Sequence, residues 1–117
     1  MKKVMIIEDE QNLLELYKDE LSEEGYEVEG YTDSERGIEH FDKFAPDVVV
    51  LDIKLDNPGG GLEILREIKT KDKNAKVILN SAYSIYKNDF TTWMADAYIV
   101  KSSDLRELKE KIRELLG

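Results

Sequence analysis

The chain has no cysteine and only one histidine among its 117 residues. The lack of cysteine excludes disulfide bonds and thiolate metal sites, and the single histidine, His40, has no second histidine with which to share a metal ion. Long apolar runs are also missing, since a membrane-spanning helix needs roughly 20 such residues. The apolar run near the N-terminus is too brief for a signal peptide. We therefore expect a soluble, cytoplasmic protein.

Positive charge is scarce as well, because 17 basic residues face 26 acidic ones and give a formal net charge of −9. Non-specific binding to nucleic acid depends on Lys and Arg neutralising phosphates, so this balance argues against it. The three glycines at 59–61 are not followed by Lys-Ser/Thr, which excludes a phosphate-binding P-loop. No G-x-G-x-x-G follows the first apolar run, which argues against dinucleotide binding. The length and the 41% hydrophobic content suit one domain, residues 1–117, with one core.

What the sequence does contain is a regular alternation of two patterns. Short apolar runs predict strands buried on both faces, and one alternating run predicts a strand with a wetter face; they lie at 4–7, 28–31, 48–51, 77–79 and 98–100. Helical spacing follows each of them, at 11–24, from Asp33 or Ser34 to 44, at 61–71, at 84–94, and from Ser103 or Asp104 to 115. Five β-α units predict an α/β fold, a single five-stranded parallel sheet with helices on both faces.

Polar and charged residues follow these strands at the edge where ligands bind in such sheets. Glu8, Asp9 and Glu10 follow the first strand, and Asp52 follows the third, most apolar run. Clustered carboxylates repel one another, and a hard divalent cation such as Mg²⁺ relieves that repulsion. Lys101, after the fifth strand, offsets further charge. A carboxylate beside Mg²⁺ can attack phosphorus and form an acyl phosphate.

Four segments in this order resemble the receiver domain of two-component response regulators, the CheY-like family: IIEDE, VVVLDIKL with GGLEIL, ILNSAYS, and ADAYIVK. The resemblance spans nearly the whole chain. It implies a domain that accepts a phosphoryl group from a histidine kinase or phosphotransfer protein in a Mg²⁺-dependent reaction. It also implies an output protein or domain that binds the face of the fourth helix, fifth strand and fifth helix. Beyond accepting the group and hydrolysing its own acyl phosphate, such a domain is not an enzyme.

The resemblance also assigns roles to individual residues. Asp52 is then the phosphoacceptor, and Mg²⁺ is held by Glu8, Asp9, Asp52 and the backbone carbonyl of Lys54. Ser81 and Lys101 bind the phosphoryl group, and the small residue Ala82 leaves access to the site. Ser81 and Tyr98 are the switch residues. Asp9 is the better candidate for direct ligation within the acidic pair.

Three departures from the family pattern stand out. The loop after Asp52 is one residue longer than usual, and the interval from Ser81 to Tyr98 is about two residues shorter. Lys101 is followed by Ser102 in place of the usual proline, so a cis X-Pro bond cannot be present there.

Other interpretations stay open at this point. The acids at 8–10 could cap the first helix through its dipole. A Mg²⁺-dependent aspartyl phosphatase has related chemistry, but it needs a second aspartate where this chain has Lys54. A receiver that binds a partner without phosphorylation is a further alternative. The chain could be a complete single-domain regulator or a receiver from a longer protein, such as a transcription activator.

Two surface features complete the expectations. Tyr83, Ile85, Tyr86 and Met94 cannot all point inward from one short helix, so we expect part of this segment to be exposed and to bind a partner. Alanine at Tyr86 would test that. The lysines from Lys69 to Lys76 are expected to form a solvated helix end, and His40 to be exposed.

Overall fold

The computed structural model of the chain describes residues 1–52, 61–82, 94–102 and 104–117. The expected helix at 84–94 and the carbonyl of Lys54 therefore lie essentially outside the described residues. The elements in chain order are β1 (Lys3–Ile7), α1 (Gln11–Glu23), β2 (Glu27–Tyr31), α2 (Ser34–Phe44), β3 (Val48–Asp52), α3 (Gly61–Lys71), β4 (Lys76–Ser81), β5 (Ala97–Val100) and α4 (Arg106–Leu116).

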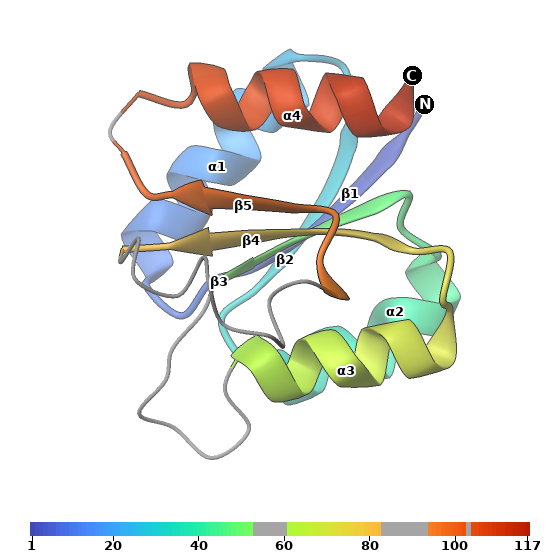
Figure 1. The fold of residues 1–117 in the computed structure, drawn as a ribbon. Coiled ribbons are helices and arrows are strands. Elements are labelled where there is room, and N and C mark those ends of the chain that lie inside the picture. The colour runs from blue at the N-terminus through green and yellow to red at the C-terminus, as the bar shows by residue number, and fades with distance from the viewer. Residues whose placement is uncertain (53–60, 83–93, 103) are drawn as a thin grey trace.

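The five strands form one parallel sheet in the order β2-β1-β3-β4-β5. Helices α1 and α4 cover one face of the sheet, and α2 and α3 cover the other (Figure 1). This confirms the α/β architecture predicted from the alternation of strand and helix patterns. The central strands β1, β3 and β4 are almost wholly buried, as their unbroken apolar runs require.

Two apolar clusters, one on each face, fix the helices against the sheet. Alternate residues of a strand point to opposite faces, so neighbours such as Val50 and Leu51 enter different clusters. On the α1/α4 face, Leu14, Leu21 and Ile112 pack over the even-numbered residues of β1 and β3. Because this alternation continues to the strand ends, it also decides toward which face each polar residue beyond the core points.

Local signals explain where the helices stop and how closely they pack. Helix α1 ends as predicted before Gly25, whose φ of +95° lies in the left-handed region that glycine adopts without strain. Gly30 lets α1 approach β2, since a Cβ there would lie 2.6 Å from Leu14 Cδ1. The Asp33 carboxylate caps α2 by accepting a hydrogen bond from Glu35 N at 2.9 Å.

The start of the last helix differs slightly from the prediction. The helix begins at Arg106, and Leu105 occupies the N-cap position without a side-chain cap. Asp104 nevertheless serves the helix end, since its Oδ1 accepts a hydrogen bond from Arg106 N at 3.0 Å. The same carboxylate binds the Arg106 guanidinium, and this contact lowers the pKa of Asp104 to about 2.

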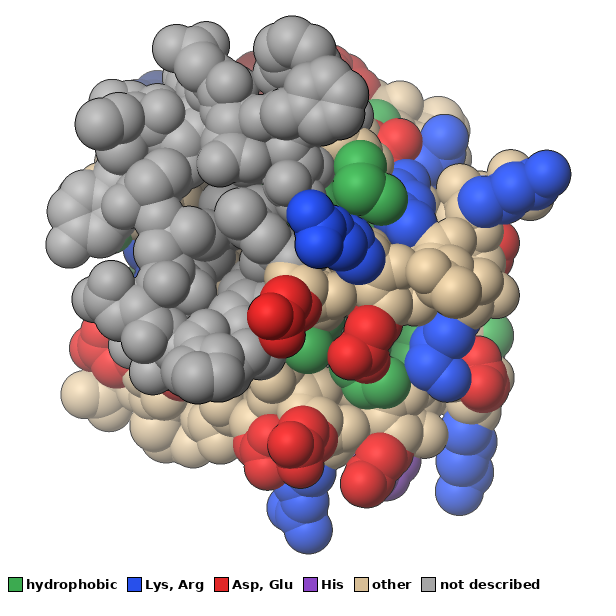
Figure 2. Space-filling view, turned by 60° about the horizontal axis from the view of Figure 1, so that its bottom comes forward, with side chains coloured by type: hydrophobic (Ala, Val, Ile, Leu, Met, Phe, Trp, Pro, Cys, Tyr) green, Lys and Arg blue, Asp and Glu red, His purple; other side chains and the backbone are tan. Residues whose placement is uncertain are grey.

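The described surface on the side of α2 and α3 is strongly polar. Figure 2 views the α2/α3 side, where acidic and basic side chains are intermixed and the visible hydrophobic areas are small. His40 is exposed, as expected, and stacks on Tyr31 with ring centroids 5.3 Å apart. No helix in the described parts of the chain is both long enough and apolar enough to cross a bilayer.

Lys69 corrects the expectation of a wholly solvated helix end. Its ammonium donates hydrogen bonds to Ala75 O at 2.7 Å and to Asp96 Oδ2 at 2.9 Å. Asp96 Oδ2 also accepts a hydrogen bond from Val77 N at 2.8 Å, and Asp96 N donates to Val77 O at 2.9 Å. Lys69 therefore joins the end of α3 to the starts of β4 and β5, a role that the spacing of the lysines did not indicate.

Candidate functional site

The site lies at the carboxyl edge of the sheet, where the ends of β1, β3, β4 and β5 come together. Asp52 is the last residue of β3, and Glu8 follows β1 directly. Lys101 follows β5, and its backbone N–H donates to Ser81 O at 2.6 Å, which anchors it to the end of β4. Strand pairing thus assembles residues that are far apart in the sequence.

An ammonium group bridges the two most buried carboxylates. Lys101 Nζ lies 2.7 Å from Glu8 Oε1 and 3.0 Å from Asp52 Oδ1. The Glu8 side chain is only 2% exposed, that of Asp52 7%, and that of Lys101 18%. Glu8 Oε2 also accepts a hydrogen bond from Glu10 N at 3.1 Å. A buried carboxylate is tolerated when a charge and hydrogen bonds compensate it, as they do here.

Asp9 completes an acidic group that could hold a cation. One carboxylate oxygen from each of Glu8, Asp9 and Asp52 lies within 4.8 Å of the others. Asp9 is exposed, whereas Glu8 is committed to Lys101 and to the backbone of Glu10. Hard oxygen donors at this spacing fit Mg²⁺, which binds few carboxylates and keeps several waters. The donor chemistry therefore fits the expected metal, and Asp9 faces solvent from which a hydrated ion arrives.

Among the described residues, the cluster brings the carboxylates of Glu8, Asp9 and Asp52 together with the ammonium of Lys101. Burial raises the pKa of Asp52, and the charge of Asp9 acts in the same direction, while Lys101 opposes both. Burial likewise raises the pKa of Glu8 against the effect of Lys101. Burial alone would lower the pKa of Lys101, but its hydrogen bonds to Glu8 and Asp52 outweigh burial and raise it. The cluster has an excess of negative charge that a cation would neutralise.

Three other expected residues lie around this cluster. Ser81 is fully buried at the end of β4, and Ala82 beside it is exposed. Tyr98 in β5 pairs with Leu79 of β4 and packs, half-buried, against the core on the α2/α3 face. Ser81 lies two residues beyond Leu79 in β4, so the strand alternation places it on this same α2/α3 face. Met94 is exposed, as part of its segment was expected to be, whereas Tyr83, Ile85 and Tyr86 lie outside the described residues.

Sequence reasoning missed a buried polar pair beside the cluster. Asn80 Nδ2 donates a hydrogen bond to Tyr17 Oη at 3.1 Å, and both residues are almost fully buried. In the sequence, Tyr17 falls at helical spacing between Leu14 and Leu21, which is the pattern of an ordinary buried stripe. Two signals were available: a tyrosine among leucines on that stripe, and an asparagine ending an otherwise apolar strand. Neither signal identifies the partner without the fold.

The fold and this cluster are those of a response regulator receiver, and the chain belongs to the response regulator receiver domain family, whose model matches residues 4–113. It is similar to the response regulator protein TrrA of Thermotoga maritima, solved in complex with Mg(2+)-BeF, with 46% identity, a TM-score of 0.91, and coverage of 98% of this chain and 99% of that one. TrrA was also solved in complex with the histidine kinase ThkA; that match has 44% identity, a TM-score of 0.91 and full coverage of both chains.

A relative among the curated proteins is the response regulator ArlR of Staphylococcus saprophyticus, which is 37% identical over 117 residues. The match covers 99% of this chain and 53% of the relative, so the chain spans about half the length of the curated relatives it matches.

Proposed function

We propose that Asp52 accepts a phosphoryl group from the phosphohistidine of a histidine kinase or phosphotransfer protein, in a reaction that depends on Mg²⁺. The observation that carries the proposal is the Lys101 ammonium lying 3.0 Å from Asp52, within an acidic group suited to a cation. The similar TrrA was solved both with Mg(2+)-BeF and with a histidine kinase, which supports the same ligand and the same class of partner for this chain.

The chemistry is a displacement at phosphorus. A carboxylate oxygen of Asp52 forms the new O–P bond, the P–N bond to the donor imidazole breaks, and its electron pair stays on the imidazole nitrogen. Glu8, Asp9, Asp52 and the carbonyl of Lys54 would hold Mg²⁺, which neutralises charge on the transferred oxygens. Lys101 supplies a fixed positive charge on the other side of the carboxylate.

The same residues would convert phosphorylation into a change of surface. We propose that the Ser81 hydroxyl and Lys101 bind the new phosphoryl oxygens, and that Tyr98 changes position as Ser81 moves. The exposed Ala82 leaves the approach to Asp52 open, so that water can attack the acyl phosphate and return the domain to its resting state. Switching of this kind needs only a few kcal/mol of bias between two states.

The changed surface would be read by an output protein or domain. We propose that this partner binds the face made by β5, α4 and the segment at 84–94. The chain would then act by protein contact, without direct contact to nucleic acid, which agrees with its formal net charge of −9.

The test is incubation with Mg²⁺ and a small acyl-phosphate donor, followed by intact-mass measurement. We expect one added phosphoryl group, which is absent with a chelator and in Asp52→Asn. Asp42→Asn, a change of the same type on the exposed surface of α2, is the matched control and should be phosphorylated normally. An unmodified wild-type mass, or equal labelling of Asp52→Asn, would refute the assignment.

A further inference from the structure

The Lys101 side chain reaches carboxylates that do not lie on the strand next to its own. Lys101 follows β5, whereas its partners Asp52 and Glu8 lie on β3 and β1, two and three strands away in the sheet. Neighbouring strands are about 4.8 Å apart, so β5 and β3 are separated by roughly 10 Å, a gap that the side chains of Lys101 and Asp52 close together. To do so, the aliphatic stem of Lys101 must cross the end of β4.

Strand alternation identifies the side chain at that crossing. Asn80 is paired in register with Asp52 on one side and with Ile99 on the other. Ile99 packs in the cluster on the α1/α4 face, and Asn80 points to the same face, where it meets Tyr17 of α1. Asp52, two residues beyond Val50, also points there. Lys101 lies just beyond the end of β5, and its ammonium reaches Asp52 and Glu8. Asn80 therefore occupies the strand end that lies between Lys101 and Asp52 in the sheet.

The orientation of the Asn80 amide is fixed by a hydrogen bond to Tyr17. The amide donates to the Tyr17 hydroxyl at 3.1 Å, and the two residues are 3% and 2% exposed. In an apolar layer such a pair is retained only when its groups are satisfied. An amide without this partner could turn to the neighbouring Asp52 carboxylate and compete with Lys101 for it.

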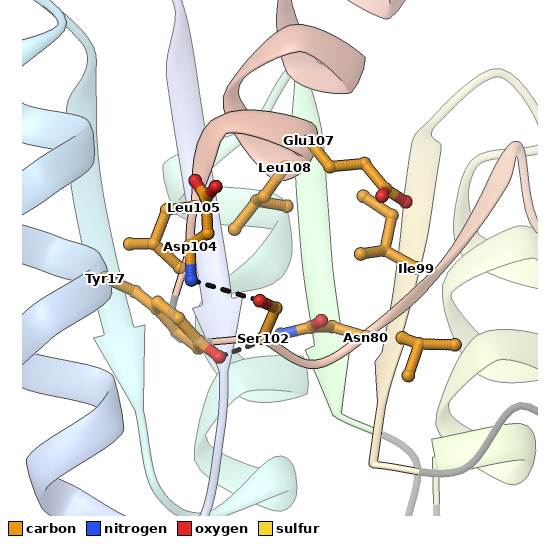
Figure 3. A pocket seen from close by; sticks show the side chains of 9 residues that line it. Tyr17, Asn80, Ile99, Ser102, Asp104, Leu105, Glu107 and Leu108 are labelled. Carbon is orange, nitrogen blue, oxygen red and sulfur yellow. Dashed lines mark hydrogen bonds between the residues drawn. The ribbon is translucent and has the colours of Figure 1, made fainter.

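Figure 3 shows the other side of this pair. Tyr17 reaches from α1 toward Asn80 at the wall of a pocket of about 120 Å³, which Ser102, Leu105 and Leu108 also line. None of the charged residues of the acidic cluster is among the described residues that line it. The Tyr17–Asn80 pair thus lines this pocket, while Asn80 is also paired in register with Asp52 of the site. The charges of Lys101, Glu8 and Asp52 all act on the Tyr17 hydroxyl, which places it within electrostatic reach of the cluster.

The connection after Lys101 fixes the backbone but not the side chain. Lys101 N is bonded to Ser81 O, and Ser102 Oγ accepts a hydrogen bond from Asp104 N at 3.1 Å. These bonds hold the backbone where the family resemblance leads one to expect a proline. They leave the direction of the Lys101 stem to the side chains that it crosses.

We infer that Tyr17 and Asn80 are a positioning pair, which directs the Lys101 ammonium onto Asp52 and Glu8 by occupying the crossing at the end of β4. The inference about phosphoryl transfer rests on the proposed function, but the placement of Lys101 in the resting protein does not. The pair touches no reacting atom and acts only through Lys101.

The test compares Tyr17→Phe, Asn80→Leu and the double variant in the full chain. The first readout is the ¹H–¹⁵N NMR signal of the Lys101 ammonium, assigned with Lys101→Arg, in the absence of a phosphodonor. We expect this signal to shift or broaden in every variant. The second readout is the rate of phosphorylation by an acyl phosphate with Mg²⁺, which should fall roughly tenfold, since small misplacements of a catalytic group reduce rates by factors of this order or more.

The double variant separates positioning from stability. Replacing both polar partners by apolar groups removes the unpaired amide, so its melting temperature should recover relative to the less stable single variant, while the rate stays low. Tyr31→Phe is the matched control, because it removes a tyrosine hydroxyl bonded at 2.5 Å to Glu29 on the edge strand β2 and keeps the backbone hydrogen bond from Glu8 N to Tyr31 O. It should leave the Lys101 signal and the rate unchanged.

Unchanged Lys101 signals in both single variants would overturn the inference, as would recovery of rate and stability together in the double variant. If the wild type accepts no phosphoryl group, the proposed function fails, and the ammonium signal still decides whether the pair positions Lys101.

Discussion

Charged groups are paired differently at the amino ends and at the carboxyl ends of the strands, which we call the amino edge and the carboxyl edge of the sheet. At the amino edge, each of two carboxylates has its own partners: Asp96 pairs with the Lys69 ammonium, and the Asp47 carboxylate accepts a hydrogen bond from the backbone N–H of Lys3 at 2.7 Å. At the carboxyl edge, Glu8 and Asp52 both contact the ammonium of Lys101 with Asp9 close by, and the pKa values of Glu8 and Asp52 are raised as a result of burial and crowding. The amino edge therefore joins elements of the fold, whereas the carboxyl edge holds crowded carboxylates that Lys101 compensates only in part.

This difference has a physical consequence for stability. A carboxyl group whose pKa is raised in the folded state contributes stability when it is protonated, below its pKa in the unfolded chain. That contribution is lost as the pH rises through the raised value. At neutral pH the carboxyl edge is therefore a source of strain, which a cation can relieve, while the amino edge is not.

The largest expected change in the free energy of unfolding comes from removing the Asp96 contacts at the amino edge. Asp96→Ala leaves the Lys69 ammonium and Val77 N–H without their carboxylate, and we expect a loss of about 2 kcal/mol in the free energy of unfolding. Denaturant unfolding measures this. Asp42→Ala removes an exposed partner of Lys71 and should change the value by less than about 0.5 kcal/mol. Equal losses in the two variants would mean that the Asp96 contacts have no special role.

Removing one of the crowded carboxylates at the carboxyl edge should change the free energy of unfolding by less, and in the opposite direction. Without divalent cation at pH 7, Asp52→Asn removes a crowded charge and leaves Glu8 for Lys101. We expect a gain of about 1 kcal/mol in the free energy of unfolding. Saturating Mg²⁺ should stabilise the wild type and shrink that gain, because binding to the folded state alone adds stability. A destabilised variant would show that Asp52 is fully compensated by Lys101, contrary to the comparison drawn above.

The smallest expected effect is on the pH dependence of Mg²⁺ binding. Protons compete with the cation for Glu8 and Asp52, and the raised pKa values move that competition above the ordinary range near 4. As the pH is lowered from 7 we expect the affinity to fall earlier than it would for carboxylates of ordinary pKa, because metal ligands must be deprotonated. Calorimetric titration at several pH values measures this, and Asp52→Asn should show a weaker dependence. An affinity that stays constant down to pH 5 would contradict the raised pKa values.

How far the sequence could predict the site depends on the kind of residue. Asp52 and Lys101 were predictable because each directly follows a strand pattern, and parallel strands bring their carboxyl ends to one edge. Tyr17, Asn80 and Asp96 were not predicted, since their partners are set by which strands are neighbours and by register. Lys69 was assigned to a solvated helix end because spacing along one helix cannot reveal a contact with a distant strand.

The sequence by itself determined the order of strands and helices, the buried character of the central strands, and the set of polar residues at the carboxyl edge. Periodicity and apolar runs are local properties, and they follow from the backbone geometry of each element. Only the tertiary structure decided which carboxylates Lys101 contacts and which side chain it crosses on the way. Those contacts depend on the strand order β2-β1-β3-β4-β5 and on the facing of each residue, which arise when separate segments pair.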